Sequence, residues 1–326
     1  MRSFPRDDEE PERWPFAPGD LIRPGLFAWQ QLGAGQRCAT WLAWSAEHCG
    51  PVVVKLPHPQ GQHSSRTRDS LRREASRLTA VNHPAFQRLL ATGLDDPVPH
   101  LVYEYVEGPT LDAVLDDHGP LPAADVALLA LQIGAALHHL HGRGLAHLDL
   151  KPANLVLRSG RVVLLDLGLA QPLGAPHPPG RPRGSVEYMA PEQIRCQPAT
   201  VAMDLFGLGA VLYELATDDL AFPDDSDNPA EPSWPQLSGP PVPPRAHVPD
   251  LPAELEDELL RLLATDPRTR PPDVAEVLRR FAALLPAEDR PWPAWVEQLP
   301  PLGRTLISSG PGRGTGGWPA RPGSPS

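Results

Sequence analysis

HLDLKPAN, residues 147–154, and LLDLG, residues 164–168, carry the strongest chemical signal in the sequence. They bring Asp149, Lys151, Asn154 and Asp166 into a short span, directly after an apolar segment that is predicted to be a long helix. Phosphoryl transfer uses such a set: a carboxylate orients the attacking hydroxyl, a cation lies near the moving phosphoryl group, and oxygen ligands hold magnesium. A polar loop after a helix is the simpler alternative, but it does not account for this combination. The span therefore predicts a phosphoryl-transfer site.

Lysine is nearly absent from the rest of the chain. The 29 basic residues are all arginines except Lys55 and Lys151. Arginine is a planar fork that does not replace a compact ammonium, so both lysines are predicted to have chemical roles. Lys55 lies in an apolar strand-like run, where an ammonium needs an anionic partner. Glu74, on the helix that is predicted to follow, could supply that partner.

The segment LGAGQRCAT, residues 32–40, lies between two predicted strands. Its small residues would let backbone N–H groups approach a phosphate. A glycine-containing hairpin turn is the ordinary alternative, and the segment alone is weak evidence for a nucleotide site. The lysine strand that follows it favours the phosphate-binding interpretation.

The first part of the chain reads as a small α+β unit. Short apolar runs separated by glycine and proline predict antiparallel strands, and Leu71, Ala75 and Leu78 at helical spacing predict a helix over 66–80. The predicted strands are FAWQQL (27–32), ATWLAWSA (39–46), VVVKL (52–56), FQRLLATGL (86–94) and HLVYEYV (100–106).

After Gly108 the pattern becomes mainly helical, which predicts a second unit. The predicted helices cover residues 110–119, 123–142, 200–217, 252–264 and 273–285. Nine prolines between Pro223 and Asp250 are too many for regular structure in that stretch. We expect residues 1–25 to be a disordered acidic, proline-containing arm and residues 286–326, with nine prolines and seven glycines, to be a flexible tail.

Composition excludes several classes of protein. No apolar run reaches the roughly 18 to 20 residues that span a bilayer, and the N-terminus lacks the apolar core of a signal peptide. We therefore expect a cytoplasmic protein without a membrane span. A net charge of −11 argues against a nucleic-acid partner. The three cysteines form no disulfide framework and no zinc-binding pair, so they are predicted to be reduced thiols.

In their order and spacing, these motifs resemble the eukaryotic-type (Hanks-type) serine/threonine protein kinase family, in a bacterial-looking composition. The resemblance extends from about Phe27 to Leu285. It implies a bilobal α+β fold, in which residues 26–107 form an antiparallel-sheet lobe with one helix and residues 108–285 form a larger, mainly helical lobe. It also implies that ATP binds in the cleft between the lobes, with Mg²⁺ or alternatively Mn²⁺.

The resemblance assigns roles residue by residue. Asp149 resembles the catalytic base and Lys151 the loop lysine at the γ-phosphate. Lys55 resembles the lysine that holds the α- and β-phosphates, and Glu74 the glutamate that pairs with it. The expected metal ligands are Asn154 and Asp166, the expected phosphate-loop contacts are Leu32, Gly33, Ala34, Gly35 and Thr40, and the expected hinge contacts around adenine are Tyr103, Glu104 and Val106.

Other positions match structural features of the family. Ala190-Pro191-Glu192 resembles the end of the activation segment, and Arg270 the buried ion-pair partner of its glutamate. Asp204 resembles the carboxylate that braces the catalytic loop, and the hydrophobic spine is matched by Leu78, His147 and Leu167. These matches favour a protein kinase over a small-molecule kinase.

Three departures from the family pattern carry information. Cys38 replaces the third phosphate-loop glycine, which should stiffen the loop. Leu148 replaces the arginine that receives an activating phosphate in the family, and residues 169–183 contain no Ser, Thr or Tyr. These two absences agree, so we expect no switch by activation-loop phosphorylation. Ser185 and Tyr188 are the only hydroxyl-bearing residues of the segment.

The expected function is therefore transfer of the ATP γ-phosphate to Ser and Thr hydroxyls of protein substrates. Ser185 stands where the family's serine/threonine members carry a threonine, which points to Ser/Thr acceptors. The alternative is a pseudokinase, an ATP-binding scaffold without turnover, which Cys38 and Leu148 mildly favour. Tryptophans 292, 295 and 318 could dock partners through the C-terminal tail.

Overall fold

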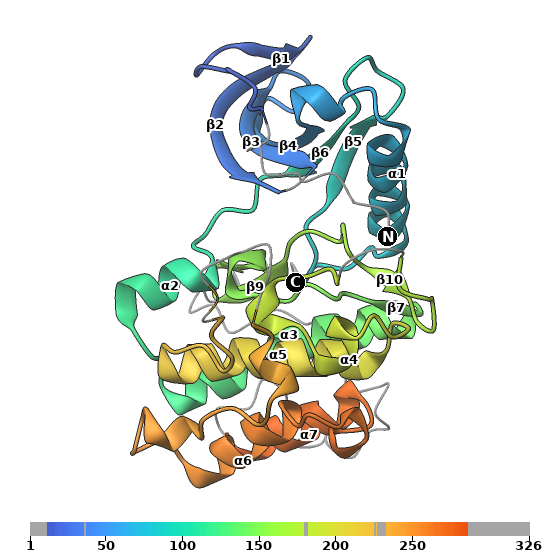
Figure 1. Cartoon of the computed structure of the whole chain (residues 1–326). Coiled ribbons are helices and arrows are strands. Elements are labelled where there is room, and N and C mark those ends of the chain that lie inside the picture. The colour runs from blue at the N-terminus through green and yellow to red at the C-terminus, as the bar shows by residue number, and fades with distance from the viewer. Residues whose placement is uncertain (1–11, 36, 179–181, 225, 227–232, 286–326) are drawn as a thin grey trace, which may run out of the picture.

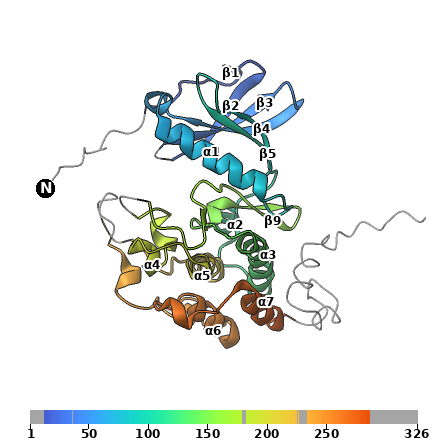
Figure 2. The same ribbon diagram turned by 90° about the vertical axis from the view of Figure 1, so that its right-hand side faces the viewer.

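The computed structural model describes residues 12–35, 37–178, 182–224, 226 and 233–285. Two lobes are stacked: a β-sheet with one long helix forms the smaller lobe, and helices dominate the larger one (Figures 1 and 2). The bilobal α+β architecture predicted from the sequence is confirmed. The expected tail, residues 286–326, lies outside the described residues.

The smaller lobe is built on a six-stranded antiparallel sheet with the order β1-β2-β3-β4-β6-β5. Successive side chains of β4 point to opposite faces of the sheet. Val52 and Val54 pack in the hydrophobic core on the face away from the larger lobe, and Val53 and Lys55 point toward the larger lobe. The strands are β1 (Leu21–Arg23), β2 (Leu26–Ala34), β3 (Cys38–Ser45), β4 (Gly50–Pro57), β5 (Leu89–Gly93) and β6 (His100–Glu104).

The prediction of a disordered arm is wrong for the second half of that segment. Within residues 12–25, β1 pairs with β2, and the indole N–H of Trp14 donates to the carbonyl of Pro57 at 2.7 Å. The Phe16 ring meets the ring of Trp41 edge-on, with centroids 5.3 Å apart. Two aromatic anchors thus dock a stretch whose charge and prolines hide any hydrophobic period. Residues 1–11 are outside the described part of the chain.

Helix α1 (Ser65–Ala80) brings an acidic side chain to the inner face of the sheet. It begins where the Ser64 hydroxyl accepts the backbone N–H of Thr67, which satisfies one of the free donors of the first turn. Leu71, Glu74 and Leu78 follow at helical spacing and are buried. The helix lies against the sheet beside β5 and β6 (Figure 2), so Glu74 faces the strands.

The larger lobe is organised around two buried helices, α3 (Ala123–Gly142) and α5 (Val201–Thr217), which pack on each other and on α6 and α7. Of the described helices, only α3 is long and apolar enough to cross a membrane, and 61% of its most apolar stretch is buried inside the protein. The other helices are α2 (Leu111–His118), α4 (Pro191–Ile194), α6 (Ala253–Leu262) and α7 (Val274–Ala283).

Short strands that the sequence analysis does not predict hold the motif-bearing loops. Strand β7 (Leu145–Ala146) pairs with β10 (Gln171–Pro172), and β8 (Leu155–Arg158) pairs with β9 (Arg161–Leu164). Residues 147–154 and 165–170 therefore run between paired strands, which fixes both loops at one edge of the lobe. The described residues of the proline-rich stretch contain only short 3₁₀ turns, at Pro235–Leu237 and Pro244–Ala246.

Candidate active site

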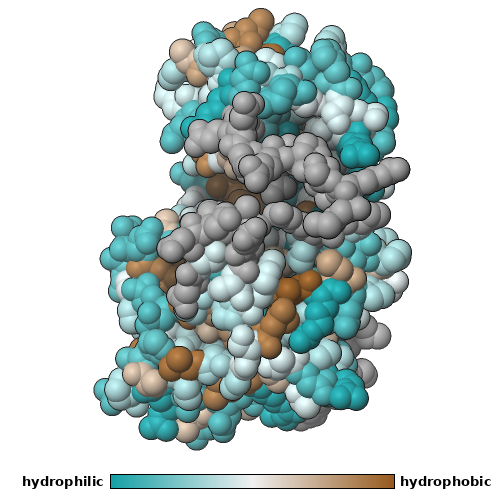
Figure 3. Space-filling view, in the orientation of Figure 1, coloured by the Kyte–Doolittle hydropathy of each residue, from teal (hydrophilic) through white to brown (hydrophobic). Residues whose placement is uncertain are grey.

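A cleft of about 460 Å³ lies between the two lobes. Brown apolar atoms are visible at this level in Figure 3, between outer surfaces that are largely teal. Both lobes contribute predicted residues to its lining: Leu32, Gly33, Thr40, Lys55, Glu74, Tyr103, Val106, Lys151, Asn154 and Asp166. Residues that are far apart in the sequence are thus brought to one cavity of the size of a ligand site.

The phosphate-loop candidate is the turn between β2 and β3, where Gly33 pairs with Thr40. The turn is closed by the Gly35 N–H, which donates to the Cys38 carbonyl at 2.9 Å. His58, buried at the end of β4, donates from Nε2 to the Gly35 carbonyl at 2.7 Å. The predicted Gly35 and its neighbour Ala34 lie at the end of this turn, beyond the residues that line the cleft. No sequence pattern indicated the role of His58.

Lys55 joins two carboxylates from different elements. Its Nζ lies 2.9 Å from Oε1 and 3.1 Å from Oε2 of Glu74, and 2.8 Å from Oδ1 of Asp166. Glu74 comes from α1 and Asp166 from the loop after β9. The ion pair predicted between Lys55 and Glu74 is therefore formed, and Asp166 completes a three-residue set at the back of the cleft.

The charges of this set depend on one another. Burial alone would raise the pKa of Asp166, but Lys55 and the Gly168 amide lower it to about 2. Burial would likewise lower the pKa of Lys55, but Asp166 and Glu74 raise it above its ordinary value. Burial raises the pKa of Glu74, and Lys55 opposes that rise. The ammonium therefore stays charged at physiological pH and faces the cleft.

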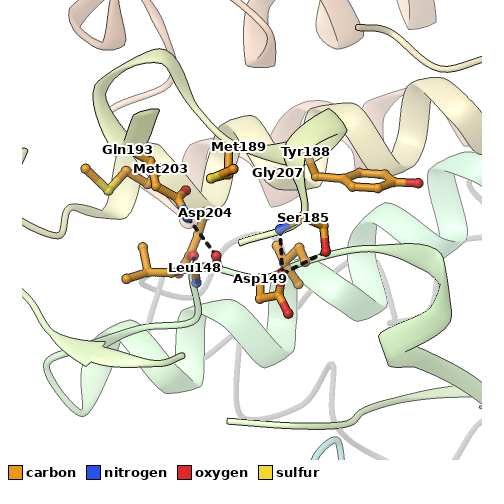
Figure 4. Close-up of a pocket in the computed structure, with 10 residues that line it drawn as sticks. Leu148, Asp149, Ser185, Tyr188, Met189, Gln193, Met203, Asp204 and Gly207 are labelled. Atoms are coloured by element: carbon orange, nitrogen blue, oxygen red, sulfur yellow. Dashed lines mark hydrogen bonds between the residues drawn. The ribbon is translucent and has the colours of Figure 1, made fainter. Parts of the chain in front are cut away.

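Asp149 lies beside the cleft, in a small hollow that it shares with Ser185 and Tyr188 (Figure 4). Its Oδ1 accepts two hydrogen bonds from Ser185, one from the hydroxyl and one from the backbone N–H, both at 3.0 Å. Its backbone carbonyl accepts from the Asn154 amide at 2.9 Å. Ser185 therefore holds one oxygen of the Asp149 carboxylate through both its side chain and its backbone.

Asp204 on α5 braces the loop before Asp149, as predicted. Its two carboxylate oxygens accept the backbone N–H groups of His147 and Leu148, each at 2.8 Å. Leu148 takes a left-handed backbone conformation with φ 67°, which an ordinary side chain adopts only when its surroundings hold it there. Asp204 thus compensates a strained turn that aims Asp149.

Two predicted residues could hold a metal ion. The Asn154 Nδ2 donates to the Asp149 carbonyl, and Asp166 Oδ1 accepts from Lys55 and Gly168. The oxygens available as ligands are therefore Oδ1 of Asn154 and Oδ2 of Asp166. Both residues line the cleft. Within the described residues, no group of three or more His, Cys, Asp or Glu could hold a metal. A pair of oxygen ligands suits Mg²⁺ or Mn²⁺, whose other ligands would come from phosphates and water.

The predicted hinge residues are expected to contact adenine through their backbone. Tyr103 and Val106 line the cleft, but the Glu104 side chain turns away and accepts from Arg88 at 3.1 Å. Its backbone carbonyl accepts from the side chain of Gln87 at 2.9 Å. An adenine contact at this carbonyl would therefore use its second lone pair, and Gln87, which itself lines the cleft, would lie beside the base.

Several wall residues of the cleft are not predicted from the sequence. Alternation along β4 carries a signal for Val53, since it precedes Lys55 by two positions and faces the same way. Gln87 and the apolar residues of the larger lobe have no such signal, because they join the cleft only through tertiary contacts. The unpredicted wall residues include Val53, Gln87, Thr110, Ala153, Val156 and Leu165.

The predicted ion pair between Glu192 and Arg270 is confirmed. The guanidinium of Arg270 makes two parallel bonds to the carboxylate of Glu192, at 2.6 and 3.0 Å, and both side chains are almost fully buried. Cys38 is half-buried near the Lys55 set. Although Lys55 opposes the shift, burial raises the pKa of the Cys38 thiol to about 11, which disfavours the reactive thiolate.

The proline-rich stretch reaches the activation segment. The buried side chain of Gln236 donates to the carbonyl of Val186 at 2.6 Å, and Val186 directly follows the serine that contacts Asp149. The hydroxyl of Tyr213 on α5 donates to the carbonyl of Val242 at 2.9 Å. This stretch, whose described residues form only short 3₁₀ turns, is therefore fixed at two points, one of them next to the candidate catalytic residues.

Most of the chain is similar in sequence to known proteins. Residues 28–280 match the protein kinase domain family. The serine/threonine-protein kinase PknB of Mycolicibacterium smegmatis is 32% identical over 215 residues, which cover 63% of this chain and 34% of PknB. The probable serine/threonine-protein kinase PkwA of Thermomonospora curvata is 32% identical over 299 residues, 89% of this chain and 39% of PkwA. The chain thus spans little more than a third of the length of these relatives.

Proposed function

Because the chain belongs to the protein kinase family, we propose that it transfers the γ-phosphate of ATP to serine and threonine hydroxyls of protein substrates. The observation that carries this proposal is the assembled set of Lys55, Glu74 and Asp166 in a cleft that also contains Lys151 and Asn154. A cation fixed between two carboxylates, with a second cation opposite, suits the polyphosphate of a nucleotide.

ATP would bind with its phosphates between the β2–β3 turn and Lys55. Lys55 would hold the α- and β-phosphates, and Glu74 would keep the ammonium in place. Asn154 and Asp166 would hold Mg²⁺ or Mn²⁺, which supplies charge neutralisation along the phosphates when bound. The apolar wall of Val53 and its neighbours suits a planar base.

Asp149 would orient the acceptor hydroxyl and take up its proton. Its Oδ1 is committed to Ser185, whereas Oδ2 accepts only a long bond of 3.4 Å from the Asn154 amide. Oδ2 is therefore the oxygen that can face the substrate hydroxyl. Lys151 would stabilise the charge that develops on the transferred phosphoryl group. The contact with Ser185 supports Ser and Thr as acceptors, because Ser185 stands where the family's serine/threonine members carry a threonine.

The proposal includes activity without phosphorylation of the activation segment, a cytoplasmic site of action and, through the C-terminal tail, docking of partners. The alternatives are a pseudokinase that binds ATP without turnover and a kinase for small molecules. The chain has a candidate residue for every group that the reaction requires, which weighs against the scaffold more than Cys38 and Leu148 weigh for it.

Transfer of labelled phosphate from Mg-ATP to the chain itself and to a generic basic protein tests the proposal. We expect transfer by the wild type, with a loss of at least roughly a hundredfold in Asp149→Ala and a comparable loss in Lys55→Arg. Asp250→Asn, which changes an exposed carboxylate before α6, serves as the control. ATP binding without transfer would refute the proposal in favour of a scaffold, and phosphorylation of metabolites but of no protein would favour a small-molecule kinase.

A further inference from the structure

Tyr103 makes a contact that the proposed reaction does not require. Its hydroxyl donates to Oε1 of Glu74 at 2.5 Å, and the same oxygen lies 2.9 Å from Nζ of Lys55. Tyr103 and Glu74 are 3% and 2% exposed. The family resemblance places Tyr103 at the hinge, in the wall of the cleft. It does not explain why this wall residue carries a hydroxyl.

The bond ties a helix to the sheet at the point where the helix must be accurately placed. Tyr103 is held in β6, where it pairs with Val53 of β4 and Leu89 of β5. Glu74 belongs to α1, which has to bring its carboxylate to Lys55 on the sheet. A buried carboxylate is stable as an anion only when its oxygens have hydrogen-bond donors. The phenol of Tyr103 supplies such a donor from the sheet, where β6 is paired on both sides.

A second contact ties the same helix to the loop after β9. The guanidinium of Arg77, one turn beyond Glu74, donates to the carbonyls of Leu167 at 3.4 Å and Gly168 at 3.2 Å. The loop that carries Asp166 is thereby attached to α1. Both attachments are made by side chains of the fold itself, and residues 169–183 contain no hydroxyl that could be phosphorylated.

We propose that Tyr103 is a positioning residue, whose hydroxyl holds Glu74 against Lys55 and so keeps the Lys55–Glu74–Asp166 set assembled without a modified activation segment. This inference rests on the proposed function for its effect on turnover. If Tyr103 only formed part of the apolar wall, phenylalanine would serve equally well. Tyr103→Phe removes only the hydroxyl oxygen, so it changes activity if Tyr103 positions Glu74 and leaves activity unchanged if Tyr103 only lines the cleft.

A double-mutant cycle separates positioning from packing. Tyr103→Phe is made in the full chain, alone and in a Glu74→Ala background. The affinity for Mg-ATP, the kcat/KM for ATP and the kcat for a peptide are measured for each variant. In the single variant we expect kcat/KM for ATP to fall roughly tenfold to a hundredfold, as for the loss of a hydrogen bond to a charged group. In the Glu74→Ala background, we expect Tyr103→Phe to have almost no further effect.

Tyr213→Phe is the matched control, because it removes a hydroxyl that donates to a backbone carbonyl in the other lobe. It should leave nucleotide affinity and turnover unchanged. Equal effects of Tyr103→Phe in both backgrounds, or no effect in either, would overturn the inference. If the wild type transferred no phosphate, the proposed function would fail, while the cycle on Mg-ATP affinity would still decide whether Tyr103 positions Glu74.

Discussion

Replacing Ser185 by alanine tests how Asp149 is aimed. The hydroxyl and the backbone N–H of Ser185 both donate to Oδ1 of Asp149 at 3.0 Å, and the alanine variant keeps the second bond. A hydrogen bond to a charged group contributes about 1.5–3 kcal/mol. Because the amide bond remains and water can reach the half-buried hollow, the lower end of this range applies, about 1.5 kcal/mol. That value corresponds to a fall of about tenfold in kcat/KM for a peptide substrate.

Steady-state kinetics with a peptide and Mg-ATP measure this loss. Ser185→Thr keeps a hydroxyl and should retain most of the activity, and the affinity for ATP should not change, because Ser185 lies outside the nucleotide cleft. Full activity of Ser185→Ala would refute the positioning role. Mass spectrometry of the active enzyme supplies a second check. Activity that requires phosphate on Ser185 would refute independence from activation-segment phosphorylation.

Three further predictions concern other parts of the chain. Gln236→Ala leaves the half-buried carbonyl of Val186 in the activation segment without its donor. KM for a peptide should therefore rise about fivefold or more with KM for ATP unchanged; equal changes in both constants would contradict this. Arg270→Leu leaves the buried carboxylate of Glu192 unpaired and should lower the free energy of unfolding by about 3–5 kcal/mol in urea titration; a loss below about 1 kcal/mol would disprove this role. Burial raises the pKa of the Cys38 thiol to about 11, so its alkylation should be slower than that of the exposed Cys49 at pH 7 and should accelerate as the pH rises toward 11; equal labelling at pH 7 would show a reactive Cys38.

The charged core of the site could be predicted because it depends on residue type and spacing. Leu71, Glu74 and Leu78 share one face of a helix, and since the apolar members must face the sheet, Glu74 faces it too. Alternation along β4 places Lys55 on the same side. The structure joins them at 2.9 Å, as this geometry requires.

Contacts between distant segments could not be predicted in the same way. The Tyr103 hydroxyl, the His58 ring and the Gln236 amide each meet a partner on another element. None of these residues breaks a local pattern, so nothing in its own neighbourhood marks it. The docking of residues 12–25 was missed for a related reason, because two isolated aromatic anchors produce no periodicity.

The surroundings of Leu148 give a physical reason why the missing arginine and the missing hydroxyls of residues 169–183 occur together. An arginine at this position would be a nearly buried cation that needs an anion, and a phosphate on the activation segment could supply it. Leu148 is only 8% exposed and packs into an apolar cluster with Ala199, Met203 and neighbouring residues, so it needs no such partner.

The neutral amide of Gln193 then links the two segments that a phosphate would otherwise hold together. Its Nε2 donates to the carbonyl of Leu148 at 2.8 Å (Figure 4). The same nitrogen donates to the carbonyl of Arg183 at 2.7 Å. The catalytic loop and the activation segment are thus joined by uncharged contacts, while Tyr103 and Arg77 fix α1 from the other side. Since neither attachment contains a group whose charge depends on phosphorylation, both support the proposal that the site assembles without a phosphorylated activation segment.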